Sequence, residues 1–228
     1  MIVIGGCAGL IVAFNSPIAA FLFAFEELGR NIKKQALILI ALCCAGVYLA
    51  SIVYHRGSEP YLSDLSTLTF DYTLIWQLIP LAIVAGLMGG AFAKIMVILV
   101  GKFIVHTKGK VLFVALILGS IVALFNYFSG GMIAGSGKEE VLLMLESERL
   151  GIDFLLMKYF ATLTSLTSTI PGGLFMPAIS IGASIGSESS AIITGINPQV
   201  IIIMAIVAYL SGTIRTPLTA TFVVLEMT

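Results

Sequence analysis

The chain has 228 residues, of which 59% are hydrophobic and 11% are charged, and its mean hydropathy is +1.09. Soluble domains carry roughly 25% charged residues, so this composition excludes an ordinary soluble domain and indicates a protein that lies in a lipid bilayer. The 12 basic and 12 acidic residues balance, so the net charge does not point to nucleic acid as a partner.

The apolar runs predict an all-α polytopic membrane protein. In chain order, we expect helices over residues 1–14, 17–28, 35–54, 74–104, 111–128, from 139 to about 148, 152–170, within 171–186, 199–212 and 217–226. The first two runs are shorter than the ~20 residues that span a membrane, so we interpret them as half-crossings joined at a break. The run over 74–104 would extend to about 46 Å as a helix, so it must tilt or protrude from a hydrocarbon core of about 30 Å.

Charged residues in the loops predict how the chain is oriented. Two basic loops, residues 29–35 and 101–110, flank an acidic loop, residues 55–73, with one apolar run between each pair. Cytoplasmic loops carry an excess of Lys and Arg. We therefore predict that residues 29–35 and 101–110 are cytoplasmic and that residues 55–73 lie outside.

The stretch from 171 to 186 places helix breakers inside an apolar run. Pro171, Gly172 and Gly173 leave backbone amides free just before Pro177 and a new helical run. A membrane protein tolerates such a break where it lines a cavity, and the amides and dipole at a helix N-terminus attract an anion. We therefore predict an anion site at the start of this helix.

The end of the chain resembles its start at a constant offset of 200 residues. The matched residues are Ser16-Pro17-Ile18-Ala19-Ala20 with Thr216-Pro217-Leu218-Thr219-Ala220, and Phe25-Glu26 with Leu225-Glu226. Inverted repeats of this kind are common in transporters. A repeat of this length puts the partner of residues 171–186 before residue 1, so we expect a fragment that holds part of a transport site. For Glu226 we expect a structural role.

The glycine-rich segment 129–138 is not a phosphate-binding P-loop. Met132 stands where that motif needs its first glycine, and Glu139 stands where Ser or Thr should follow the lysine. Glu139 and Glu140 instead fall in a first helical turn, where acidic residues complement the helix dipole.

Other polar residues within the apolar runs have ordinary explanations. We expect Lys94 and Lys158 to extend toward the membrane surface or to pair with other groups. The cysteines, Cys7, Cys43 and Cys44, lack metal-ligand spacing. They are predicted to be buried as small hydrophobic residues, and no metal site is expected.

Several of these motifs resemble one known family, and they occur in its order along nearly the whole chain. Ala13 to Pro17 with Phe25-Glu26-Glu27, Gly172 to Pro177, and Arg215 to Leu218 with Leu225 to Thr228 are similar to the CLC family of chloride channels and chloride/proton antiporters. The segment Gly173-Leu174-Phe175-Met176-Pro177 fits that family's GxFxP motif.

The resemblance implies a partial CLC-type inverted-repeat bundle with broken helices. Residues 1–128 would hold the end of the first membrane repeat and the first long helices of the second, and residues 129–228 the core of the second repeat. The family's gating glutamate would precede residue 1 and its anion-coordinating tyrosine would follow Thr228, so both are absent from this sequence.

The resemblance also implies which residues act. The backbone amides of Gly173, Leu174 and Phe175 would bind the anion. Glu27 falls on the internal proton-transfer glutamate of the antiporters, a position that is usually apolar in channels. Chloride would be the substrate, protons would be the coupled ion, and no cofactor is implied. The whole protein would be a homodimer in the lipid bilayer, as a multi-pass protein of the bacterial inner or plasma membrane.

The leading hypothesis is therefore chloride/proton antiport, and two alternatives remain. A passive chloride channel shares the fold, and Glu27 argues against it. A helical fragment or assembly partner that transports nothing alone would fit the missing first-half motifs. An enzyme is not expected, because no serine–histidine pair, aspartate dyad or His/Glu metal motif lies in the predicted spans.

Overall fold

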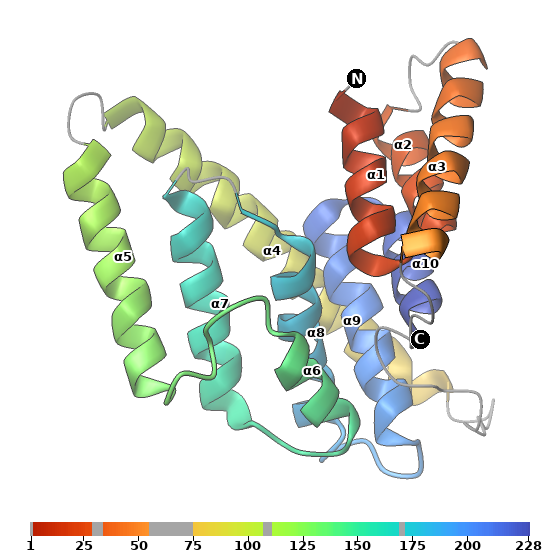
Figure 1. Ribbon diagram of the computed structural model, residues 1–228. Coiled ribbons are helices and arrows are strands. Elements are labelled where there is room, and N and C mark those ends of the chain that lie inside the picture. Colours follow the sequence, from red (N-terminus) through yellow and green to blue (C-terminus); the bar gives the residue numbers. More distant parts are fainter. Residues whose placement is uncertain (1, 29–33, 55–74, 107–110, 169–171) are drawn as a thin grey trace. The chain divides into compact units, whose positions relative to one another are not determined.

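The computed structural model describes residues 2–28, 34–54, 75–106, 111–168 and 172–228, and these residues form helices and turns but no strands (Figure 1). The prediction of an all-α chain is confirmed, and each expected helix is present. The helices are α1 (Ile2–Phe14), α2 (Pro17–Leu28), α3 (Lys34–Tyr54), α4 (Ile75–His106), α5 (Val111–Phe128), α6 (Lys138–Leu145), α7 (Gly151–Thr167), α8 (Phe175–Ser189), α9 (Pro198–Ile214) and α10 (Pro217–Met227).

The chain divides into two compact units. Unit 1 contains Met1–Leu68 and Ile214–Thr228, and unit 2 contains Thr69–Thr213. The predicted boundary between residues 128 and 129 lies within the second repeat and separates its first long helices from its core. Compactness does not test a division of that kind, so this boundary stays a prediction.

Unit 1 is built on α2 and α10, which pack on each other, while α1 and α3 pack on α2. Both central helices begin with a proline that follows a turn. The turn residues Asn15 and Arg215 have φ angles of 53° and 59°, a left-handed backbone that residues other than glycine rarely adopt. These two residues are 200 positions apart, so the repeat seen in the sequence includes the backbone conformation of the break.

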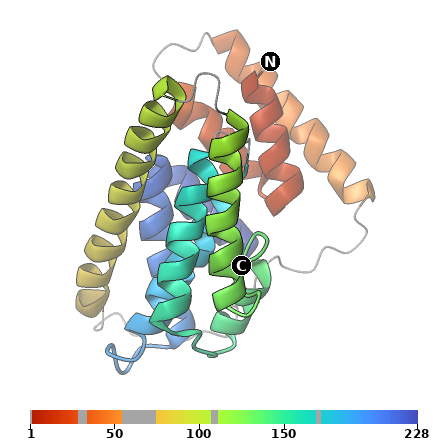
Figure 2. The same ribbon diagram turned by 90° about the vertical axis from the view of Figure 1, so that its left-hand side faces the viewer.

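Unit 2 is centred on α7 and α8. Helix α7 contacts α4, α5 and α8, and α8 also contacts α4 and α6. Figure 2 shows α7 between α4 and α5. Side chains from Ala178 to Ser187 are buried on every face of α8. This burial holds the body of α8 firmly, while its first residues remain more accessible.

Glycines allow α8 to approach α9 closely. A Cβ atom added to Gly182 would lie 2.8 Å from the Cα atom of Ile206, and one added to Gly186 would lie still closer to the Cα atom of Ile202. Any larger residue would force the two backbones apart, as is typical of helix pairs in membranes, where small residues permit close packing.

The outer faces of α4 and α5 are apolar. Large apolar or aromatic side chains such as Leu87 on α4 and Leu112 and Phe128 on α5 are exposed to 69%, 88% and 68%. Among the described residues, one helical segment, Ile75–Gly101, is long and apolar enough to cross a membrane by itself. Apolar exposure on this scale fits a surface that faces lipid rather than water.

Candidate functional site

The N-terminus of α8 carries the predicted anion site. The helix begins at Phe175, with Leu174 as the N-cap residue and no side-chain hydrogen bond from that cap. The first hydrogen bond at this end runs from the Ala178 amide to the Leu174 carbonyl, at 3.0 Å. Pro177 has no N–H group, and the first N–H groups of an α-helix point out of its N-terminal end rather than to carbonyls of the same helix. The amides of Leu174, Phe175 and Met176 therefore mark the positive end of α8.

The two glycines just before α8 are accessible. Gly172 and Gly173 are exposed, whereas Leu174 and Phe175 are partly buried. A Cβ atom added to Gly173 would meet no atom within 4 Å. The predicted donors Gly173, Leu174 and Phe175 thus lie together at the helix start, and their role in anion binding stays a prediction. Met176 adds a fourth amide, which its position just before Pro177 could have indicated.

Glu27, the predicted proton-transfer residue, is the penultimate residue of α2 and lies in the other unit. Its side chain lies outside the described side chains, so its role stays a prediction. The side chain of the preceding residue, Glu26, is described. Its Oε1 atom accepts a hydrogen bond from the Leu218 amide at 3.0 Å, and its Oε2 atom accepts bonds from the Thr219 amide at 2.7 Å and the Thr219 hydroxyl at 2.6 Å. Glu26 therefore caps the N-terminus of α10.

Glu226 makes the same contact in the opposite direction. Its Oε1 atom accepts a hydrogen bond from the Ile18 amide at 3.0 Å, and its Oε2 atom accepts one from the Ala19 amide at 2.8 Å. The end of α10 thus caps the start of α2, which confirms the structural role expected of Glu226. Because each helix ends at the start of the other, α2 and α10 run antiparallel, as an inverted repeat requires. The sequence signal was an acidic residue nine positions after proline in both repeats.

Lys158 is bound inside unit 2. Its side chain on α7 is 2% exposed, and its Nζ atom donates hydrogen bonds to the carbonyls of Ile133 at 3.0 Å and Gly135 at 3.3 Å. The lysine therefore holds the glycine-rich turn before α6, because a buried ammonium group needs such partners. Lys94 on α4 is exposed instead. These lysines were expected to pair or to extend outward. Lys158 pairs with backbone carbonyls, and Lys94 is exposed.

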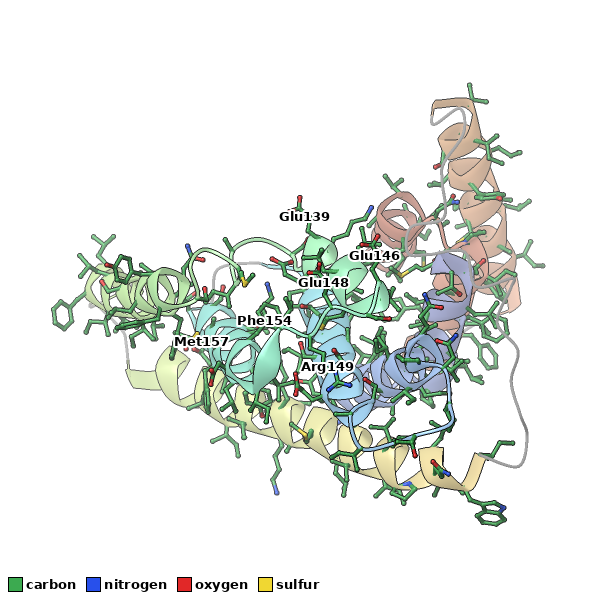
Figure 3. All side chains as sticks on the ribbon, turned by 90° about the horizontal axis from the view of Figure 1, so that it is seen from below. Glu139, Glu146, Glu148, Arg149, Phe154 and Met157 are labelled. Atoms are coloured by element: carbon green, nitrogen blue, oxygen red, sulfur yellow. The ribbon has the colours of Figure 1, made fainter. Side chains whose placement is uncertain are left out.

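The same turn brings α6 against α8. Gly137 has a φ angle of 90°, and a Cβ atom at this position would lie 2.6 Å from the Ser180 hydroxyl oxygen. Helix α6 then begins with Glu139 and Glu140 in its first turn, as expected. Figure 3 shows Glu139 on this helix and the exposed side chains of Glu146 and Glu148 where the chain turns toward α7.

The cysteines differ in one respect from the sequence prediction. Cys7 and Cys44 are buried, at 1% and 6% exposure, but Cys43 is only partly buried. The prediction was wrong for Cys43 because adjacent residues on a helix point about 100° apart, so α3 cannot bury both on the same face. Within the described part of the chain, no group of three or more His, Cys, Asp or Glu residues could hold a metal ion.

The whole chain is similar to known proteins of one family. The family model described as "Voltage gated chloride channel" matches residues 1–228. The curated relatives include the H(+)/Cl(-) exchange transporter ClcA of Vibrio campbellii, 27% identical over 246 residues, which cover 98% of this chain and 50% of the relative. The protein of the same name from Salmonella agona is 27% identical over 239 residues, with coverages of 98% and 50%. The chain thus spans about half the length of the curated relatives it matches.

Two solved structures share the fold. One is a slow cyanobacterial Cl-/H+ antiporter, with a TM-score of 0.81 and 23% sequence identity, covering 100% of this chain and 56% of the other. The second is a CLC-type fluoride/proton antiporter, with a TM-score of 0.74 and 18% identity, covering 94% of this chain and 58% of the other. These two similarities confirm the predicted helical fold, and this chain corresponds to 56% and 58% of the two solved chains.

Proposed function

The chain belongs to the voltage gated chloride channel family, and we propose that the protein exchanges chloride for protons across a membrane. The observation that carries the chloride half is the start of α8. Its cap residue, Leu174, has no polar side chain, and the preceding residues Gly172 and Gly173 are exposed. The names of the curated relatives support the exchange of chloride for protons.

Backbone amides suit an ion that must be released again. Each charge-assisted hydrogen bond from an amide contributes about 1.5–3 kcal/mol, so the amides of Gly173, Leu174 and Phe175 can hold chloride without a fixed positive side chain. Conduction needs a site that binds an ion strongly enough to admit it and weakly enough to let it leave. In this proposal chloride is the substrate, transport replaces catalysis, and no cofactor takes part.

The proton half of the proposal rests on Glu27. In the repeat, Glu26 and Glu226 are equivalent, and both cap the partner helix. The equivalent of Glu27 is Met227, which is fully buried. A carboxylate needed only for folding would be expected in both repeats, whereas Glu27 occurs in one. Carboxylates at the membrane boundary are candidates for proton relay, so we assign Glu27 as the proton carrier.

The test is coupled flux in lipid vesicles that contain the purified full-length protein. Chloride release would be followed with an electrode and proton movement with a pH-sensitive dye. We expect a chloride gradient to drive protons uphill, Glu27→Gln to stop proton movement while chloride still moves, and the control Glu27→Asp to retain coupling. Unchanged proton flux in Glu27→Gln would remove Glu27 from the mechanism. Chloride flux that never drives proton movement would instead support a passive chloride channel. The absence of any chloride flux would support a helical assembly partner that transports nothing alone.

We further propose that two copies of the protein associate through α2 and α10. Ile18 and Phe25 on α2 are 53% and 50% exposed, and their repeat equivalents on α10, Leu218 and Leu225, are 49% and 63% exposed. A surface with its own local two-fold arrangement suits a symmetric dimer. The mass of the complex in mild detergent tests this, since a monomer would mean that lipid covers the same face.

We also propose that the protein lies in a bacterial inner or plasma membrane with residues 29–35 and 101–110 in the cytoplasm. The basic residues of these loops support that orientation. Single cysteines introduced at Lys33 and Lys108 should react with a membrane-impermeant reagent only from the cytoplasmic side. Labelling from the outside would reverse the assigned topology.

A further inference from the structure

The two carboxylate caps join α2 and α10 at both ends. Glu26 binds the first amides of α10 and Glu226 binds the first amides of α2, so each helix end is tied to the start of the other. The last turn of a helix normally frays because its carbonyls lack intrahelical partners. In α2 the cap instead ties this turn to a second helix two residues before its end at Leu28.

The two caps are not equal. Glu26 accepts three hydrogen bonds, because the Thr219 hydroxyl adds one at 2.6 Å to the two backbone bonds. Glu226 accepts two, because the repeat equivalent of Thr219 is Ala19, which has no hydroxyl. The stronger cap is thus the one whose carboxylate directly precedes Glu27.

We propose that Glu26 is a positioning residue for proton transfer: by anchoring the last turn of α2 to α10, it fixes the backbone of Glu27. This inference rests on the proposed function of Glu27. Consecutive Cα atoms are 3.8 Å apart, so the anchor acts on the neighbouring residue directly. Displacing a reacting group by about 1 Å can lower a rate by about a hundredfold, so loss of the anchor should slow proton transfer. Glu26 acts through Glu27 and does not itself carry the proton.

The experiment compares Glu26→Gln with the matched control Glu226→Gln in the full-length protein in vesicles. Each variant removes one carboxylate from the same helix pair, so both should lower the melting temperature in detergent. Glu26→Gln should reduce proton flux by about tenfold and lower the proton-to-chloride ratio. Glu226→Gln should leave the ratio at the value of the unmodified protein. Equal reductions in the ratio, or an unchanged ratio in Glu26→Gln, would overturn the proposal.

A milder pair of variants covers the case in which Glu26→Gln does not fold. Thr219→Ala removes one of the three hydrogen bonds to Glu26, and Thr219→Ser keeps the hydroxyl. The proton-to-chloride ratio should fall in the alanine variant and return with serine, whereas equal ratios would contradict the anchor. Glu27→Gln separates the two proposals. Coupling lost in Glu27→Gln but intact in Glu26→Gln refutes only the anchor, and coupling intact in Glu27→Gln refutes the proton role itself.

Discussion

Of the described helices that begin at or near a proline, α2, α8 and α10 divide into two kinds. The N-termini of α2 and α10 each hold a carboxylate from the partner helix, at hydrogen-bond distances of 2.7–3.0 Å. The N-terminus of α8 follows two glycines and has Leu174 as its cap residue, whose side chain has no oxygen to accept a hydrogen bond. All three ends present backbone amides and the positive end of a helix dipole.

The difference shows how one local structure can serve folding or binding. Where a carboxylate of the protein occupies the amides, the helix end is neutralised permanently and joins two helices. Where no side chain from the cap position reaches them, the amides can receive an anion from solution. The structural sites at α2 and α10 therefore differ from the proposed chloride site at α8 in what binds the amides, a carboxylate of the protein or an anion from solution.

The largest expected effect on chloride binding comes from placing a carboxylate at the N-terminus of α8, as α2 and α10 already have at theirs. Leu174→Asp places a carboxylate at the N-cap position, where Asp favourably accepts amide hydrogen bonds. A carboxylate about 4 Å from chloride repels it by about 4 kcal/mol at an effective dielectric constant of 20, or about a thousandfold in affinity. Calorimetric titration of the full-length protein with chloride would measure this loss. The neutral control, Leu174→Asn, should bind chloride far more tightly than Leu174→Asp does. Equal chloride binding in the two variants would contradict the proposed site.

A smaller effect follows from removing one donor and adding no charge. The φ angle of Leu174 is −93°, and proline requires about −65°, so Leu174→Pro removes the amide but needs a backbone adjustment of about 30°. Its carbonyl remains to accept the bond from Ala178. One lost charge-assisted hydrogen bond predicts chloride binding weaker by about 10- to 100-fold. Leu174→Ala keeps the amide and should bind nearly normally. If proline and alanine bind equally, this amide is not a ligand.

Much of this comparison was accessible from the sequence because it depends on local rules. Apolar runs predicted the helices, and Gly172, Gly173 and Pro177 predicted the break before α8. The offset of 200 residues predicted that the segments at Pro17 and Pro217 are equivalent. These features need only hydrophobic length and the conformational limits of glycine and proline, which act within a few residues.

The partners across the fold could not be predicted in the same way. The repeat matched Glu26 with Glu226, but it did not predict that Glu26 accepts hydrogen bonds from Leu218 and Thr219, which lie 192 and 193 residues away. Lys158 was expected either to pair or to reach the membrane surface, and the structure decides between these by placing it under the carbonyls of Ile133 and Gly135. Such contacts depend on how the helices pack, and a local pattern does not encode that.

The smallest expected effect is on stability, and it comes from a substitution that makes the Glu226 cap resemble the Glu26 cap. Ala19→Thr would give Glu226 the hydroxyl donor that Glu26 already receives from Thr219 at 2.6 Å. Both positions are fully buried, and the antiparallel pairing places them in equivalent surroundings. One added hydrogen bond should therefore raise the free energy of unfolding by about 1 kcal/mol. Thermal unfolding in detergent measures this, with Ala19→Val as the control of similar shape and no hydroxyl. If threonine and valine destabilise the protein equally, the surroundings of Ala19 lack room for the hydroxyl, and the caps differ in packing as well as in their hydrogen bonds.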